Sequence, residues 1–176
     1  EHDPSRFIVR GELIEGRQKE NIRRTGKSHL FNDPNSNFNP APRQWCMIDI
    51  DDLELPAEYA DIDASKPAIL AYTTAKLPEA FRGVDCHYQF SASMGVKKDK
   101  VRVHLWYWLN RSVSDAEMKA WMGQSDVPVD MSLFRPVQPH FTANPIFENG
   151  AINPFPNRSG LYDAHSGQDT VTVPEN

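Results

Sequence analysis

The stretch from Lys100 to Leu109 begins with strict alternation of polar and apolar side chains, and this pattern constrains the fold more than any other feature of the sequence. A period of two is typical of a β-strand that packs one face on a core. The earlier stretch from Val84 to Ser91 also predicts a strand. Because segment 93–99 between them contains Gly95 and several polar residues, we expect a turn that joins an antiparallel pair.

Other segments predict the elements around this pair. Ser114 and Glu117 form a capping box that starts a short helix, which Gly123 ends. The other expected elements are a polar helix over 12–27, a loop over 32–43, a strand around Asp49, an irregular acidic stretch over 54–67, a helix near 67–80 with Pro67 in its first turn, a strand over 127–134 that carries Asp130, and a long wrap from Pro136 onward with at most a few short strands. The pattern predicts an α+β fold with a mainly antiparallel sheet.

The composition is that of one ordinary globular domain, over residues 1–176. The sequence has no apolar run long enough to span a membrane and no signal-peptide pattern, so we expect a cytoplasmic protein with no membrane partner. It begins without methionine, and we expect it to be excised from a longer chain. Cys46 and Cys86 are predicted to be buried thiols, with a disulfide as the alternative, and they form no Cys-x-x-Cys pair for zinc.

The net charge of −5 argues against a strong, non-specific coat of nucleic acid, because such binding depends on lysines and arginines that neutralise phosphates. It leaves room for a local basic groove. Positive residues gather in two clusters, one around Arg23 and Arg24 and one over 97–102. Each cluster alone is more often a solvated face than a binding site.

Asp49 and Asp51 are the strongest candidate for a functional site. Side chains two apart on a strand project to the same face, so these carboxylates lie together while Ile48 and Ile50 turn into the core. Two adjacent carboxylates repel unless a cation or a proton lies between them, and oxygen ligands favour magnesium, manganese or calcium. The alternative is a pair of solvated aspartates. Segment 61–63 has the same Asp-x-Asp spacing, but it is expected in a polar loop and is interpreted as functionally silent.

The strand from Lys100 carries the opposite charge. Lys100, Arg102 and His104 share one face, and such donors suit a phosphate chain, although a solvated strand face is the alternative. The run 106–108, Trp-Tyr-Trp, is interpreted as sheet core rather than as a platform for stacking bases. Together with Asp130 and the Asp49/Asp51 pair, the basic strand has the parts that two-metal phosphoryl transfer requires: one ion activates the attacking 3′-hydroxyl and the other stabilises the leaving pyrophosphate.

The order of these motifs resembles the archaeo-eukaryotic primase superfamily, the primase-polymerases, and most closely the versions encoded by phages, plasmids and integrated mobile elements. Its first motif, hydrophobic-Asp-hydrophobic-Asp, is matched by 48–51. A small-residue turn and a strand ending in histidine are matched by 91–95 and 103–105. Its third motif, a hydrophobic residue followed by Asp, is matched by 129–130 and continues through 133–145. The resemblance spans residues ~20 to ~173.

The resemblance implies an RRM-like antiparallel sheet with an N-terminal α/β unit packed beside it. It implies that Asp49, Asp51 and Asp130 are ligands of Mg²⁺ or Mn²⁺ and that His104 contacts the phosphates of the incoming nucleotide. Arg102 stands where many members have a serine, which leaves open whether Ser91, Ser93 or the lysines complete the phosphate site. No cysteine/histidine cluster for a zinc-binding insert is visible.

The implied function is that of a DNA primase/polymerase, a template-dependent nucleotidyltransferase that makes or extends primers in the replication of a mobile element. The expected partners are single-stranded DNA, nucleoside triphosphates and a helicase module, with Arg23 and Arg24 on the DNA. One alternative is a metal-dependent nuclease or replication initiator, although the His-x-His pair of nicking enzymes is absent. The other is a non-catalytic, RRM-like module that binds nucleic acid without a metal.

Overall fold

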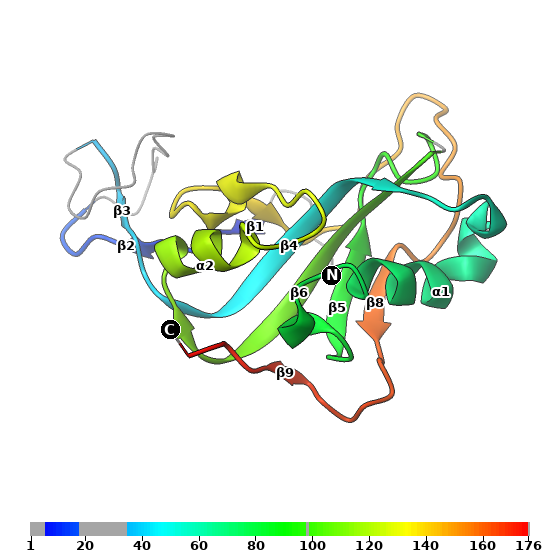
Figure 1. Cartoon of the computed structure of the whole chain (residues 1–176). Helices are drawn as coiled ribbons and strands as arrows, with labels where there is room; N and C mark the ends of the chain where they lie inside the picture. Colours follow the sequence, from blue (N-terminus) through cyan, green and yellow to red (C-terminus); the bar gives the residue numbers. More distant parts are fainter. Residues whose placement is uncertain (1–5, 18–34, 98, 176) are drawn as a thin grey trace.

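A five-stranded sheet forms the centre of the protein in the computed structural model, which describes residues 6–17, 35–97 and 99–175 (Figure 1). In chain order the elements are β1 (Phe7–Ile8), β2 (Glu12–Leu13), β3 (Phe38–Asn39), β4 (Arg43–Glu54), the 3-10 helix η1 (Ala57–Tyr59), α1 (Ile62–Thr74), η2 (Glu79–Phe81), β5 (Cys86–Phe90), β6 (Lys100–Val113), α2 (Asp115–Met122), η3 (Met131–Phe134), β7 (His140–Phe141), β8 (Ser159–Tyr162) and β9 (Thr170–Val171). The expected α+β fold with a mainly antiparallel sheet is confirmed.

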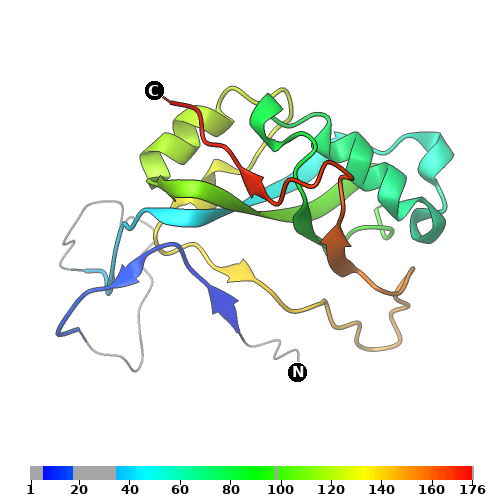
Figure 2. The ribbon, with the colours of Figure 1, turned by 90° about the horizontal axis from the view of Figure 1, so that it is seen from below.

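The sheet has the strand order β4-β6-β5-β8, with every pair along this path antiparallel. Strand β9 joins it in parallel beside the second half of β6. The predicted pairing of the strand before Gly95 with the strand after it is therefore confirmed as β5 and β6. Figure 2 shows the two helices on one side of this sheet and the short strands β1 and β7 on the other.

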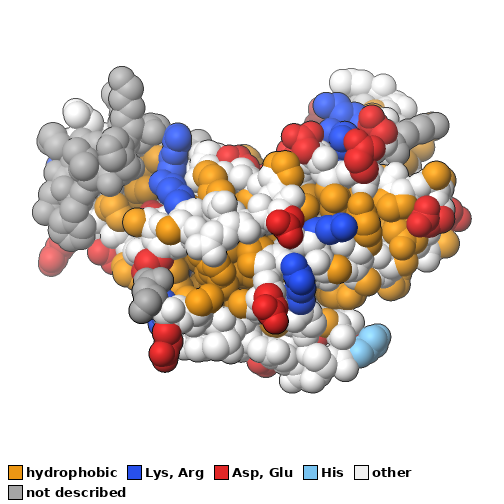
Figure 3. All heavy atoms as spheres, viewed as in Figure 1, with side chains coloured by type: hydrophobic (Ala, Val, Ile, Leu, Met, Phe, Trp, Pro, Cys, Tyr) orange, Lys and Arg blue, Asp and Glu red, His pale blue; other side chains and the backbone are white. Residues whose placement is uncertain are grey.

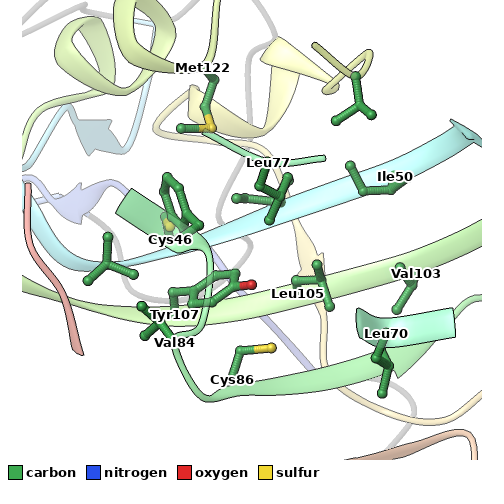
Figure 4. Close-up of a cluster of buried hydrophobic side chains, with 14 of the residues drawn as sticks. Cys46, Ile50, Leu70, Leu77, Val84, Cys86, Val103, Leu105, Tyr107 and Met122 are labelled. Carbon is green, nitrogen blue, oxygen red and sulfur yellow. The ribbon is translucent and has the colours of Figure 1, made fainter. Parts of the chain in front are cut away.

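Strand alternation separates the core from the open face. Cys46 on β4, Tyr107 on β6 and Cys86 on β5 point to the helix side and lie near one another in the core (Figure 4). Both cysteines are free, as predicted, and burial raises the pKa of each thiol to about 12. Met118 and Met122 of α2 close the same core, as expected for the apolar face of an amphipathic helix.

The helix expected near 67–80 begins earlier and ends sooner. Asp61 is its N-cap, since the Asp61 carboxylate accepts a hydrogen bond from the backbone N–H of Ala64, and Pro67 lies inside the helix rather than in its first turn. An aspartate that satisfies a free amide starts a helix more effectively than a proline alone. Segment 61–63 is therefore a helix start, not the polar loop that we expected. The capping box of Ser114 and Glu117 is confirmed.

The strand expected over 127–134 is wrong. Asp130 instead caps η3: its carboxylate accepts hydrogen bonds from the backbone N–H and the hydroxyl of Ser132, at 2.8 and 2.7 Å. Pro128 has no N–H to give to a sheet, and a local aspartate bond of this kind favours a turn over a strand. The polar helix expected over 12–27 is also wrong where the structure describes it, because residues 12–17 contain β2 and a turn.

The C-terminal wrap forms the short strands β7, β8 and β9, as expected, and its part between β7 and β8 crosses the open face of the sheet (Figure 2). The buried side chain of Gln89 on β5 fixes it there by donating a hydrogen bond of 2.7 Å to the Ala143 carbonyl. Within the described residues, neither α-helix is long and apolar enough to cross a membrane.

Candidate functional site

The open face of the sheet carries the candidate residues in rows that run across the strands. Asp49 of β4 lies opposite His104 of β6, which lies opposite Gln89 of β5. The next row is formed by Met47, Trp106 and His87. Because alternate residues share a face, Asp51 and Arg102 lie on this face beyond the first row. The prediction that Asp49 and Asp51 project together is confirmed, because Asp49 faces His104, Asp51 faces Arg102, and the charge of Asp51 acts on Asp49, while Ile48 and Ile50 are fully buried.

Asp49 and His104 form the more buried of two cross-strand pairs in this site. His104 Nε2 lies 3.6 Å from Asp49 Oδ1, and both side chains are largely buried. Arg102 Nη1 lies 3.4 Å from Asp51 Oδ1. Within the described part of the chain, three buried polar atoms here have no hydrogen-bond partner: Asp49 Oδ1, His104 Nδ1 and Arg102 Nε. Buried polar atoms are almost always satisfied, so these three atoms are open to a hydrogen bond from a water, an ion or a ligand.

The electrostatics of the site disfavour the charged form of Asp49. Burial raises the pKa of Asp49 to about 7, and the charges of Asp51 and Asp130 act in the same direction, while Arg102 opposes them. Burial also lowers the pKa of His104, with the charge of Asp51 opposing the shift. At neutral pH the imidazole is therefore neutral, and the repulsion between the two neighbouring carboxylates is relieved by a proton on Asp49 or by a cation.

Asp130 lies within electrostatic reach of Asp49, but its carboxylate is bonded to Ser132 in its own turn. Among the described residues, no group of three or more His, Cys, Asp or Glu side chains is arranged to hold a metal ion. The structure thus brings Asp49 and Asp51 together without placing Asp130 in one ligand set with them. Two carboxylates still fit Mg²⁺, which keeps several waters and takes its other ligands from substrate phosphates.

The expected phosphate-binding residues divide into two groups. Arg102 and His104 stand on the open face with free nitrogens. Lys100 instead pairs with Glu54 at 2.6 Å, and this hydrogen bond raises the lysine's pKa. Ser93 lies in the turn after β5, where its hydroxyl is 3.1 Å from that of Ser91. The turn starts beside Arg102, because Ser91 N–H donates to the Arg102 carbonyl.

Arg158 is a site-supporting residue that the sequence did not reveal. It is almost fully buried and donates hydrogen bonds to the carbonyls of Ser91 at 2.7 Å and Met94 at 3.1 Å. Its guanidinium also lies over the Phe155 ring, 4.2 Å from the centroid. It therefore connects the C-terminal wrap to the turn after β5 that carries Ser91 and Ser93, which we call the serine turn. An arginine between asparagine and serine in a proline-rich segment gives no sequence signal of such a role.

A groove of about 650 Å³ opens on the same face, beyond the second row of the site. Aromatic and aliphatic side chains line it, among them Ile8, Trp45, His87, Trp106, Trp108 and Leu161. The interpretation of the Trp-Tyr-Trp run as sheet core is thus correct for Tyr107 alone. Trp106 lies half-buried on the open face, and Trp108 is 64% exposed.

The remaining candidates, Arg23 and Arg24, lie outside the described residues. On the face seen in Figure 3, Lys and Arg are interspersed with Asp and Glu and do not form one basic patch.

Comparisons of the chain with protein-family models, with curated proteins and with solved structures find no match.

Proposed function

We propose that this chain is the catalytic domain of a DNA primase/polymerase, which joins a nucleotide to a primer 3′-hydroxyl on a single-stranded template and releases pyrophosphate. The observation that supports the proposal is the Asp49–His104 cross-strand pair, with Asp51 and Arg102 beside it and three unpartnered buried polar atoms on one sheet face. Carboxylates for a cation and nitrogen donors for phosphates are what this reaction needs from a protein.

Each residue has a role that follows from its chemistry. Asp49 and Asp51 would hold Mg²⁺ or Mn²⁺, which when bound lowers the pKa of the attacking hydroxyl and offsets the charge of the phosphates. Arg102 directs its unpartnered Nε–H to a phosphate oxygen. His104 is neutral at pH 7, so it offers one N–H donor without adding a charge.

The serine turn supplies further donors. Ser91 and Ser93 present two hydroxyls in the turn beside Arg102. Arg102 itself stands at the position where many members of the superfamily have a serine. Asp130 acts through its charge on Asp49, or it becomes a ligand of the metal ions once substrate is present. In this proposal the sheet is the RRM-like core of the superfamily, the template is single-stranded DNA, and a helicase module acts with the chain. Arg23 and Arg24 remain proposed DNA contacts.

The test is a synthesis assay on a primed single-stranded template with Mn²⁺ or Mg²⁺, with Asp49→Asn and Asp51→Asn as site variants. Asp63→Asn is the matched control, because Asp63 belongs to a pair of the same spacing in the first turn of α1, which lies on the other side of the sheet. We expect both site variants to lose synthesis and the control to keep it. Full activity in either site variant contradicts the proposal. Shortening of a labelled strand without nucleotides identifies a nuclease instead.

A further inference from the structure

The groove on the open face is separate from the His104 row. The fully buried side chain of His140 packs on Trp45 and Trp106 and covers the path between them. Large apolar side chains that are exposed to solvent also line the groove, and they come from β1, β6 and β8: Ile8, Trp108 and Leu161. Apolar side chains gathered in a hollow of about 650 Å³ indicate a binding surface.

Three aspartates make one side of this groove negative. Asp85 and Asp163 lie near each other, because each is the next residue beyond the pair Cys86–Tyr162 in the β5–β8 ladder. Asp169 immediately precedes β9. All three line the groove, and its described lining contains no lysine or arginine to balance them. This side therefore repels phosphates, whether of nucleic acid or of an anionic lipid, and attracts a cation.

Each of these carboxylates uses one oxygen locally and keeps the other for a ligand. The three Oδ1 atoms accept hydrogen bonds from the Ala164 N–H at 2.8 Å, the His165 N–H at 2.6 Å and the Thr170 hydroxyl at 2.8 Å. Within the described residues, the three Oδ2 atoms have no partner. The lining histidine, His87, adds no positive charge at pH 7, because burial lowers its pKa.

We propose that the groove docks a basic and apolar peptide segment of a partner protein, whose arginine side chains contact both the indoles and the aspartates. A guanidinium stacks on aromatic faces and pairs with carboxylates. The groove offers both groups on neighbouring strands, because Trp108 of β6 pairs with Thr170 of β9, and Asp169 is the residue before Thr170. Trp45 and Trp106, with ring centroids 5.7 Å apart, contact the apolar side chains of the peptide. The inference does not rest on the proposed reaction.

The charges favour another protein over a second copy of this chain. In a symmetric contact between copies the same surface meets itself, so the three aspartates of one copy would face those of the other. The net charge of −5 on each chain adds to that repulsion.

The exposed side chains favour a peptide over a small organic cation. Trp108 is 64% exposed and Leu161 is 84% exposed. A small ligand inside the groove leaves these tips in water, whereas a peptide that continues beyond the groove covers them.

The test measures binding of a labelled hexapeptide that alternates arginine and leucine to the full chain, by fluorescence anisotropy. In one matched peptide citrulline replaces arginine, which removes the charge and keeps a planar hydrogen-bonding group. In the other, serine replaces leucine, which keeps the charge and removes the apolar side chains. We expect each matched peptide to bind about tenfold more weakly than the first one. Binding of the arginine peptide should weaken as salt is added, because salt screens the aspartates.

Variants of the chain locate the peptide. We expect Trp108→Ala to weaken binding about tenfold and Trp108→Phe to restore part of the loss. Asp163→Asn should weaken binding of the arginine peptide and leave binding of the citrulline peptide unchanged. Ile152→Ala and Asp126→Asn are the matched controls, because both residues are exposed and neither lines the groove. Both controls should keep the affinity of the parent chain.

Equal binding of the arginine and citrulline peptides overturns the inference, and so does full affinity in Trp108→Ala. Absence of binding at peptide concentrations up to about 1 mM overturns it as well. Displacement of the peptide by an equimolar amount of phenyltrimethylammonium identifies a small organic cation as the occupant instead. An oligothymidylate that loses affinity in Trp108→Ala identifies nucleic acid. Self-association that Trp108→Ala abolishes, without peptide binding, identifies a contact between copies. Because nucleotide incorporation is not measured, failure of the proposed reaction leaves this test intact.

Discussion

His104 Nε2 lies 3.6 Å from Asp49 Oδ1 across the β4–β6 ladder, while His104 Nδ1 is buried and has no partner within the described chain. The first nitrogen therefore faces the carboxylate site, and in the tautomer with its hydrogen on Nδ1 the second can donate to a substrate oxygen. Replacing His104 with Ala should slow nucleotide incorporation about 10- to 100-fold, because a hydrogen bond to a charged phosphate is lost. His165→Ala, at an exposed position, should leave the rate unchanged in the same primer-extension assay. An equal loss in both variants contradicts the role given to His104.

The raised pKa of Asp49 leads to a prediction about how a divalent ion changes the free energy of unfolding. Its raised pKa, about 7, means that the charged carboxylate destabilises the metal-free fold above that pH. Asp49→Asn should therefore raise the free energy of unfolding at pH 8, by on the order of 2 kcal/mol. Mn²⁺ should stabilise the parent chain, by about 2.7 kcal/mol at about 100 times its dissociation constant.

Thermal melting with and without Mn²⁺ measures both effects. Asp49→Asn should melt higher than the parent chain without the ion and should not respond to it. Asp63→Asn keeps the Asp49/Asp51 pair and should respond to Mn²⁺ as the parent does. An equal Mn²⁺ response in all three chains would place the ion elsewhere.

The sequence predicted the parts of this site that depend on strand alternation. Asp49, Arg102 and His104 lie on one face because a period of two is a property of the strand itself. The position of Asp130 could not be predicted in this way, because a local bond to Ser132 decided between strand and turn. Arg158 was missed because its role depends on a contact with residues more than 60 positions earlier in the chain.

The helices also show which features a local pattern predicts and which it does not. The sequence predicts the capping box of Ser114 because both partners are local, whereas the proline six positions after Asp61 gives a competing signal for the start of the helix. The faces of Trp106 and Trp108 followed from alternation, but their exposure depends on which segment crosses that face. No local pattern shows that the wrap from Pro136 leaves Trp108 uncovered.

His140 predicts a loss of stability in mild acid. Its side chain is fully buried between Trp45 and Trp106, and burial, followed by the charge of Arg10, lowers its pKa to about 4. The unfolded chain binds a proton near pH 6.5, and the folded chain does so only near pH 4. Stability should therefore fall as the pH drops through this window, by up to about 3 kcal/mol from this residue.

Urea unfolding at pH 7, 5.5 and 4 tests this prediction, with His140→Phe as the variant that does not titrate. The comparison is made in the Asp49→Asn background, because Asp49 has a raised pKa and acts with the opposite sign between about pH 7 and 4. The chain that retains His140 should lose more stability on acidification than the His140→Phe variant. Parallel pH profiles would show that His140 does not control this loss.

Gly95 gives a prediction that separates backbone strain from packing. Its φ is +81°, and a Cβ there would lie 2.9 Å from Pro154 Cγ and 3.2 Å from atoms of Ile62 and Phe155. Gly150 has nearly the same φ, +80°, but a Cβ there would meet nothing within 4 Å. Gly150→Ala should therefore cost only the strain of a left-handed residue, about 1–2 kcal/mol. Gly95→Ala should cost about 1–3 kcal/mol more, because the contacts are too close.

Chemical denaturation of the two variants gives this difference directly, and equal losses would show that Pro154 and Phe155 move aside at little cost. The same pair of variants links the turn to the site. Gly95 lies in the turn that carries Ser93 and that Arg158 holds through the Ser91 and Met94 carbonyls. If the turn positions donors for the triphosphate, Gly95→Ala should raise the KM for nucleotides more than Gly150→Ala does, at a temperature where both chains are folded. A KM unchanged in Gly95→Ala would remove the serine turn from the phosphate site while leaving Arg102 and His104 in it.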